Sequence, residues 1–217
     1  MDISYLGHSS FKIKGKTATV LNDPFDPSMV GIKFPKTEAD IVTVSHHHAD
    51  HNQLERVEGV KKVISGPGEY EVMGVSFIGI ASFHDSDKGE NRGKNTIFVL
   101  EMDGLRLAHL GDLGEKLSQS QLEEIGDIDV LMIPVGGFFT IGPREASEII
   151  QEIEPYFVIP MHYNCPDLNQ SQFGKLSFLD DFLRESGLVV ERLPKFNLKK
   201  EDINPGQAAK IIALERK

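Results

Sequence analysis

The chain has 217 residues and a formal net charge of −10, with 40% hydrophobic and 26% charged residues. This composition is typical of one globular domain, and the excess of acidic residues argues against non-specific binding to nucleic acid. We expect no membrane segment, because the apolar runs are far too short, and a cytoplasmic location, because the start lacks signal-peptide features and only one cysteine is present.

The first half of the sequence predicts short strands separated by turn residues. Each candidate is a run of β-branched, aromatic and other apolar residues bounded by turn-forming residues. Asp103 and Gly104 lie between the last two runs and are a strong signal for a hairpin turn. The predicted strands are Ile3–Leu6, Ser10–Ile13, Ala18–Leu21, Ile41–Val44, Lys62–Ile64, Val75–Ile80, Thr96–Met102 and Arg106–Leu110.

The second half alternates predicted strands with amphipathic helices. Ser118 is a helix cap, and Pro143 lies in the first turn of a segment whose apolar residues recur at helical spacing. The predicted helices are Ser118–Ile125, Pro143–Ile153 and Leu176–Ser186, and the strands are Val130–Pro134, Phe157–Pro160, Leu188–Glu191 and Lys210–Leu214. Because no linker or repeat interrupts it, this order favours one α/β domain, residues 1–217, in which two sheets carry helices on their outer faces.

Four of the eight histidines fall in one six-residue window, directly after the predicted strand Ile41–Val44. The window contains His46, His47, His48, Asp50 and His51. In extended backbone, residues two apart face the same side, so His46 and His48 converge while His47 points away. A following turn then brings Asp50 and His51 to a second position nearby. Imidazole is a suitable ligand for zinc, iron or nickel, and the added carboxylate means that manganese is also a candidate. The window therefore predicts a metal site.

Two simpler explanations of this window fit less well. An affinity tag would be terminal and uninterrupted, and the window is neither. A solvated histidine-rich loop would need neither Asp50 nor an apolar strand leading into it. For His47 by itself, a position at the surface or beside the ligands is the better interpretation.

Further segments carry a family resemblance. The spacing His-x-His-x-Asp-His after a strand resembles the signature of the metallo-β-lactamase superfamily. Five other blocks, in the same order, resemble its branch of small stand-alone metal-dependent hydrolases related to ascorbate 6-phosphate lactonase. These blocks are Tyr5–Phe11, Asn22–Phe25, Ala108–Asp112, Pro134–Pro143 and Ile159–Asn164, and with the window the resemblance covers roughly Ile3 to Asn164.

The resemblance implies a four-layer αββα sandwich and two divalent metal ions. By position, His46, His48 and a third histidine would hold the first ion, Asp50, His51 and His162 would hold the second, and Asp112 would bridge the pair. Zinc is the expected metal, with manganese, nickel and iron left open. A water molecule between two such ions can lose its proton near neutral pH and become the nucleophile.

Side chains outside the window complete the predicted site. His84 matches the family's ligand block and is the expected third ligand of the first metal, with His109 as the alternative. His109 and His8 could protonate the leaving group or be structural, and Asp50 could accept a hydrogen bond from the nucleophile. Asp23 resembles an aspartate that supports the histidine loop, although an ordinary turn residue is the alternative.

Together these observations predict an enzyme that hydrolyses a small lactone, ester or phosphoester. We expect no nucleic acid or membrane partner, and a homo-oligomer is possible. An RNA nuclease is the main alternative, which the acidic charge disfavours and salt-dependent RNA binding would reveal. An oxygen-reducing di-iron site would need a flavin partner domain, and a metal-binding protein without turnover also stays open. Leu113 and Phe138 depart from the family pattern and are expected to make the pocket rim more apolar.

Overall fold

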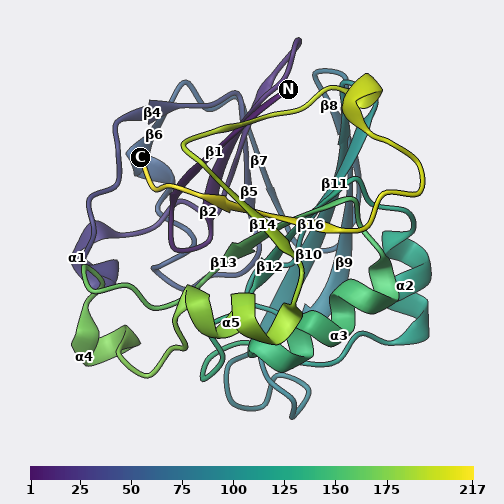
Figure 1. Ribbon diagram of the computed structural model, residues 1–217. Helices are drawn as coiled ribbons and strands as arrows, with labels where there is room; N and C mark the ends of the chain where they lie inside the picture. Colours follow the sequence, from purple (N-terminus) through teal and green to yellow (C-terminus); the bar gives the residue numbers. More distant parts are fainter.

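The computed structural model describes residues 1–217 and contains sixteen strands, five α-helices and two short 3-10 helices (Figure 1). The first seven strands are β1 (Asp2–Gly7), β2 (Ser10–Lys14), β3 (Thr19–Asn22), β4 (Thr37–Glu38), β5 (Ile41–Val44), β6 (Val57–Glu58) and β7 (Lys62–Ser65). The others are β8 (Gly68–Val72), β9 (Val75–Phe83), β10 (Lys94–Met102), β11 (Leu105–His109), β12 (Val130–Pro134), β13 (Phe157–Met161), β14 (Val189–Leu193), β15 (Phe196–Asn197) and β16 (Lys210–Leu214). The helices are α1 (Pro27–Val30), η1 (Leu54–Arg56), α2 (Gln119–Ile125), α3 (Pro143–Ile153), α4 (Gln170–Phe173), α5 (Leu179–Ser186) and η2 (Lys200–Asp202).

The strands form two large sheets and one small one. The six-stranded sheet has the order β15-β1-β2-β3-β5-β7, and the eight-stranded sheet has the order β14-β16-β13-β12-β11-β10-β9-β8. β4 and β6 pair separately. The hairpin between β10 and β11 turns at Asp103 and Gly104, both with positive φ (57° and 77°), which confirms the predicted hairpin turn.

The two large sheets pack face to face, and β10 shows how one strand serves two cores. Phe98 and Leu100 belong to the core between the sheets, whereas Ile97 and Val99 belong to the core beneath the helices. This alternation follows from the two-residue period of a strand. The middle of β10 is apolar on both faces and is therefore buried on both sides.

Helices α2, α3 and α5 cover the outer face of the eight-stranded sheet, and α1 and α4 lie on the other side of the molecule (Figure 1). α3 buries Ala146, Ile149 and Ile150, at the helical spacing expected from the sequence. The outer layer over the six-stranded sheet is mainly loop, because α1 and α4 have four residues each. The four-layer order is thus confirmed, with one layer built largely from irregular segments.

Strand direction determines which loops meet at one end of the sandwich. β1 and β2, and β2 and β3, are antiparallel, and β3 and β5 are parallel, so β1, β3 and β5 point the same way. By the same reasoning β9, β11 and β13 share one direction in the other sheet. The chain segments after these six strands are the segments that carry the predicted site residues.

Some elements differ from the sequence-based prediction. β8 was not predicted, because it is an edge strand whose Glu69 and Glu71 are exposed, so its apolar signal is weak. α5 begins at Leu179 instead of Leu176, because Leu176 packs into the core beneath the six-stranded sheet and Phe178 occupies the cap position. α1 and α4 are too short to leave a periodic pattern.

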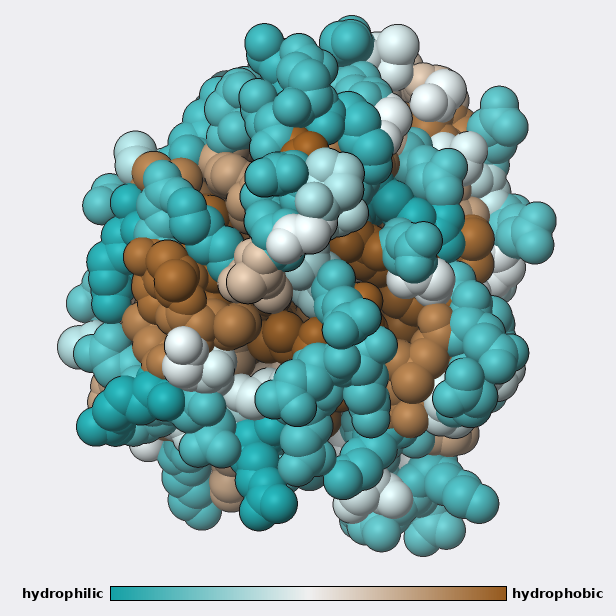
Figure 2. Space-filling model, turned by 45° about the vertical axis from the view of Figure 1, so that its right-hand side comes forward, coloured by the Kyte–Doolittle hydropathy of each residue, from teal (hydrophilic) through white to brown (hydrophobic).

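Polar side chains cover most of the face shown in Figure 2, and hydrophobic residues show in recesses between them. The large hydrophobic residues with the most exposure include Phe138, Phe178 and Val189, which lie on different segments. None of the helices combines the length and the hydrophobicity that a membrane-spanning helix requires.

Candidate metal centre

The predicted site residues meet where the two sheets present the ends of their strands. The window from His46 to His51 follows β5, whereas His84 follows β9, Asp112 follows β11 and His162 follows β13. The window itself is a bend and turn, because β5 ends at Val44. The expectation that His46 and His48 converge through extended backbone is therefore wrong in its mechanism, although both side chains do converge.

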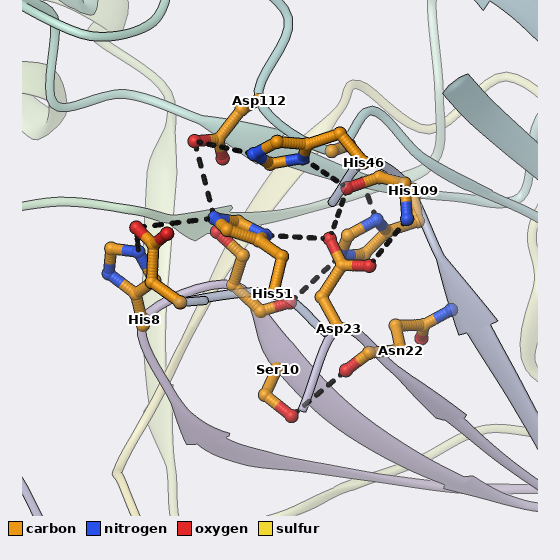
Figure 3. Close-up of polar contacts among 12 residues, drawn as sticks. His8, Ser10, Asn22, Asp23, His46, His51, His109 and Asp112 are labelled. Carbon is orange, nitrogen blue, oxygen red and sulfur yellow. Dashed lines mark hydrogen bonds and ion pairs between the residues drawn. The ribbon is translucent and has the colours of Figure 1, made fainter. Parts of the chain in front are cut away.

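Asp112 is the carboxylate at the centre of this group. Its Oδ2 lies 3.2 Å from Nε2 of His51, 3.2 Å from Nε2 of His162 and 3.3 Å from Nε2 of His84. The Nε2 of His46 is 3.9 Å away. One carboxylate oxygen therefore faces imidazoles from both sheets, and Figure 3 shows it beside the rings of His46 and His51.

Around Asp112 the other donors form two groups. His46, His48 and His84 form one, and Asp50, His51 and His162 form the other together with His8; within each, the donor atoms lie within 4.8 Å of one another. These are the two sets that the resemblance implies, with His84 in the first set and His8 as an addition to the second. His47 is exposed and lies in neither.

Asp23 holds the two histidines of the window that are most buried. Its Oδ2 accepts hydrogen bonds from His51 Nδ1 at 2.9 Å and from Ser45 Oγ at 2.5 Å, and Ser45 Oγ in turn lies 2.9 Å from His46 Nδ1 (Figure 3). Because the Nδ1 atoms are occupied in this way, the Nε2 atoms of His46 and His51 face the centre. Hydrogen bonds of this kind orient imidazole ligands and fix their tautomers.

His8 lies beneath Asp50, out of contact with the open cleft. Its Nε2 is 3.1 Å from Asp50 Oδ2, and its ring packs against His162 with centroids 4.2 Å apart. Burial lowers the pKa of His8 to about 4, an effect that the nearby His162 reinforces. A neutral His8 that donates from Nε2 therefore orients the Asp50 carboxylate.

The imidazoles of the first group favour the neutral form. Burial lowers the pKa of His46 well below its ordinary value, and His51 acts in the same direction. Burial, followed by the neighbouring His84, also lowers the pKa of His48. Neutral imidazoles keep a free lone pair, which is what a metal ligand requires.

The carboxylates favour the ionised form. Burial opposes ionisation of Asp112, but His162 and His51 hold its pKa well below the usual range. Burial also opposes ionisation of Asp50, but the neighbouring His51 and the hydrogen bond from His8 lower the pKa of Asp50. Burial opposes the charged form of His51, yet Asp112 and Asp50 raise its pKa well above the ordinary value. The two carboxylates thus create a site that favours positive charge.

Several buried polar atoms at the centre have no hydrogen-bond partner. They include His46 Nε2, His51 Nε2 and Asp112 Oδ1. An unsatisfied buried polar atom costs about 1–3 kcal/mol, so a group of them indicates a missing ligand. Imidazole nitrogens and ionised carboxylates are the donor set of a divalent metal ion, which would replace the proton that the carboxylates favour on His51. The residues present therefore fit such an ion.

The backbone is strained at three of these residues. His8, Asp23 and His162 have φ values of 54°, 44° and 53°, a left-handed conformation that costs a non-glycine residue roughly 1–2 kcal/mol. Gly111 also has a positive φ of 56°, and a Cβ there would lie 2.6 Å from Cβ of Ser45. Each of these residues immediately follows a strand or precedes a ligand, where the chain must turn sharply.

Ser45 and Asn95 support the site, and the sequence analysis missed both. Asn95 Oδ1 accepts a hydrogen bond from the backbone of Asp112 at 3.0 Å, and its amide donates to Ser82 Oγ and to the carbonyl oxygen of Leu110. Asn95 is a buried polar residue at the start of the apolar strand β10, and that contrast was the available signal. Ser45 offered no signal except its place beside His46.

Three expectations need correction. His109 is fully buried, with Nε2 2.8 Å from the carbonyl oxygen of Ser9 and Nδ1 accepting from the backbone of Gly111, so neither ring nitrogen is free to act as an acid. Leu113 is also fully buried, in the core beneath the helices, and does not reach the pocket rim. Phe138 packs against Phe139, and it is Phe139 that lines the cleft.

The centre opens to solvent through a cavity of about 320 Å³. Asp50, Asp112, His48, His84 and His162 form its floor. Its walls are formed by Met29 of α1, Ala49 of the histidine window, Asn91 and Arg92 of the loop between β9 and β10, Phe139, and Gln172 and Phe173 of α4. A small molecule can therefore reach the predicted ligands directly.

Residues 2–162 match the family model described as a beta-lactamase superfamily domain. A metal-dependent hydrolase of Thermococcus onnurineus is 32% identical over 190 residues, covering 75% of this chain and 84% of that protein. One of Methanoculleus marisnigri is 30% identical over 235 residues, covering 97% of each chain. A crystal structure from Thermotoga maritima, of a candidate zinc-dependent hydrolase of the metallo-β-lactamase superfamily, is 37% identical with a TM-score of 0.78, covering 99% of both chains.

Proposed function

We propose that this chain, which belongs to the metallo-β-lactamase superfamily, is a metal-dependent hydrolase of a small lactone, ester or phosphoester that uses two divalent metal ions. The observation that carries the proposal is the position of Asp112. Its Oδ2 lies within 3.2–3.3 Å of three imidazole nitrogens that belong to two separate donor groups. A carboxylate in that position is suited to bridging two ions.

The ligand assignment follows from the two groups. His46, His48 and His84 would hold one ion, and Asp50, His51 and His162 would hold the other, with Asp112 shared. A donor set dominated by imidazole favours zinc, while the carboxylates leave manganese, nickel and iron as alternatives. His8 would orient Asp50 without binding metal, because its Nε2 donates to that carboxylate.

Divalent cations bound there would lower the pKa of a water molecule and polarise the scissile bond, so that hydrolysis proceeds at neutral pH. Asp50 is ionised and lines the cavity, so it can accept a hydrogen bond from the attacking water and orient it. Water adds to the carbonyl carbon or the phosphorus, the bond to the leaving oxygen breaks, and that oxygen takes a proton. The apolar walls of Phe139 and Phe173 exclude bulk water from one side.

The proposal predicts that metal content depends on Asp112 and His84 but not on His47. We expect the unaltered protein to bind two equivalents of zinc and Asp112→Ala and His84→Ala to bind fewer, because each substitution removes a donor from the centre. Hydrolysis of lactone, ester and phosphodiester probes should fall by at least about 100-fold, the scale on which loss of a preorganised catalytic group acts. Elemental analysis and initial rates provide the two measurements.

His47→Ala is the matched control, because His47 belongs to the same window yet is exposed, and its side chain forms a hydrogen bond only with Asn52. It should retain both metal and activity. Two retained equivalents of metal in Asp112→Ala would overturn the dinuclear assignment. Tight, salt-sensitive binding of single-stranded RNA in place of probe hydrolysis would point to a nuclease.

A further inference from the structure

One cation stands in the wall of the cavity without an anionic partner. Arg92 lines the same cavity as Asp112 and His84, and its guanidinium forms no ion pair and no hydrogen bond. By contrast, the guanidinium groups of five other arginines each pair with a carboxylate: Arg106, Arg144, Arg184, Arg192 and Arg216. In a chain with 33 acidic and 23 basic residues, an arginine left free beside the site is available to a ligand.

The guanidinium is held in place by aromatic rings. Its Cζ lies 5.2 Å from the ring centroid of Phe139 and 6.0 Å from that of Phe138. Such cation–π contacts orient an arginine without using its N–H donors. All of these donors therefore remain free to bind an oxyanion, and the planar guanidinium matches a phosphate or carboxylate in two-point geometry.

The Asp85 carboxylate is the main acceptor of backbone hydrogen bonds in the loop that carries Arg92. Asp85 accepts hydrogen bonds from the backbone N–H groups of Asp87, Gly89, Asn91 and Arg92, at 2.7–3.1 Å. His84, which precedes Asp85, donates its own N–H to the carbonyl oxygen of Gly93. The position of Arg92 is therefore linked to that of His84, a predicted metal ligand, through the hydrogen bonds of this loop. The loop holds the guanidinium in place before any ligand binds.

The surroundings of Arg92 also favour a negative ligand. A second recess, of about 460 Å³, adjoins the histidine window, and both Arg92 and Lys94 line it whereas no carboxylate does. Lys175 lies over the ring of Phe138, with its Nζ 4.8 Å from the ring centroid. Arg92 and Lys94 thus share a recess without carboxylates, and Lys175 contacts the same ring as Arg92, whereas the two carboxylates that line the cavity, Asp50 and Asp112, are both predicted metal ligands.

We propose that Arg92 binds an oxyanion group of the substrate, so that the substrate class is a small ester or lactone that also carries a phosphate or carboxylate. This inference rests on the proposed hydrolase function. Phe139 and Phe173 would contact the apolar part of the substrate, while the floor of the cavity receives the bond to be broken. Arg92 is a specificity-determining residue in this arrangement and takes no part in bond cleavage.

The test compares two probes that differ in one charged group. 4-Nitrophenyl hexanoate ends in a methyl group, and mono-4-nitrophenyl adipate has a carboxylate in its place. We expect the zinc-loaded protein to prefer the adipate, and Arg92→Gln to lower kcat/KM for the adipate by roughly 10- to 100-fold, mainly through KM, as for loss of a charge-assisted hydrogen bond. The hexanoate should change by less than about threefold, since uniform binding of the neutral part is unaffected.

Two further variants make the comparison specific. Arg92→Lys should recover part of the preference, because an ammonium group binds oxyanions as a point charge. Arg56→Gln is the matched control, because Arg56 is also free of ion pairs but is exposed on η1. Melting temperature and zinc content, measured for each variant, establish that the protein is folded and loaded.

Binding of phenylphosphonate to zinc-loaded protein, measured by calorimetry, supplies a readout that needs no turnover. Weaker phosphonate binding in Arg92→Gln but not in Arg56→Gln supports the anion site, whether or not the esters are hydrolysed. Absence of ester hydrolysis would count only against the hydrolase proposal. If kcat/KM falls by the same factor for both esters, or if the preference for the adipate survives in Arg92→Gln, the anion site is overturned while the hydrolase proposal stands. Unchanged phosphonate binding together with no turnover overturns both.

Discussion

At the scale of single residues, Asp23 does more than its place in an Asp-Pro turn indicates. It is fully enclosed, and burial opposes its ionisation, but the hydrogen bond from His51 lowers its pKa below the ordinary value. The resulting carboxylate orients His51 directly and His46 through Ser45. One side chain that contacts no substrate therefore sets the direction of two predicted ligands.

This arrangement predicts that Asp23→Asn weakens metal binding while leaving every predicted ligand in place. We expect zinc affinity to fall by roughly 10- to 100-fold, the usual effect of losing such a supporting hydrogen bond. Asp26→Asn is the control, because Asp26 lies three residues away and only caps α1. Competition with a fluorescent zinc chelator measures both variants, and equal affinity for the two would refute the role given to Asp23.

At the scale of elements, the decisive feature is the loop between β9 and β10. This segment has no regular secondary structure, yet one carboxylate organises it: Asp85 accepts four backbone N–H groups. The loop begins at His84 and ends beside Arg92, so it connects the predicted metal ligand with the proposed anion site. Its order depends on local hydrogen bonds and not on a hydrophobic core.

Asp85→Ala should therefore release the loop and leave the sandwich intact. We expect the amides of Gly89, Asn91 and Arg92 to exchange with solvent much faster, since their acceptor is lost, while the amides of β9 and β10 keep their protection. Asp87→Ala is the control, because the Asp87 carboxylate accepts only from the Asn91 side chain. Slow exchange in the loop of Asp85→Ala would show that other contacts hold it.

At the scale of the whole molecule, the predicted metal centre joins the two sheets. The histidine window follows a strand of the six-stranded sheet, and His84, Asp112 and His162 follow strands of the eight-stranded sheet. The backbone N–H of His162 also donates to the carbonyl oxygen of His8 across this junction. Ions bound there would link the sheets at the end where strained turns and unpaired polar atoms weaken the packing.

Metal removal should therefore lower the melting temperature of the entire domain. A ligand present at about 100 times its dissociation constant stabilises the folded state by about 2.7 kcal/mol. For a chain of this length that corresponds to a shift of roughly 5–10 °C. Scanning calorimetry with zinc and with a chelator measures the shift in melting temperature. The double variant His84→Ala and Asp112→Ala should show little shift. A shift in that variant equal to that of the unaltered protein would place the stabilising metal elsewhere.

Sequence alone was sufficient for properties that repeat along the chain. The strands β5, β12 and β13 are buried throughout and almost entirely apolar, α3 has helical spacing, and the His46–His51 window stands out by composition. All were therefore predicted with small errors at their ends. Weakly patterned elements were missed: β8 is an exposed edge, and α1 and α4 are single turns. Periodicity identifies a segment only if one of its faces is buried over several residues.

Only the tertiary structure decided between residues that local patterns treat alike. His84 and His109 both lie at the ends of strands, but His84 faces Asp112 whereas His109 is occupied by the backbone of Ser9 and Gly111. Likewise, nothing local distinguishes Arg92 from the paired arginines. Periodicity reports which face a residue presents within its own element, but distances between side chains depend on how two sheets pack together. The sequence therefore determined which donors this protein carries, and the packing of the sheets decided which of them meet.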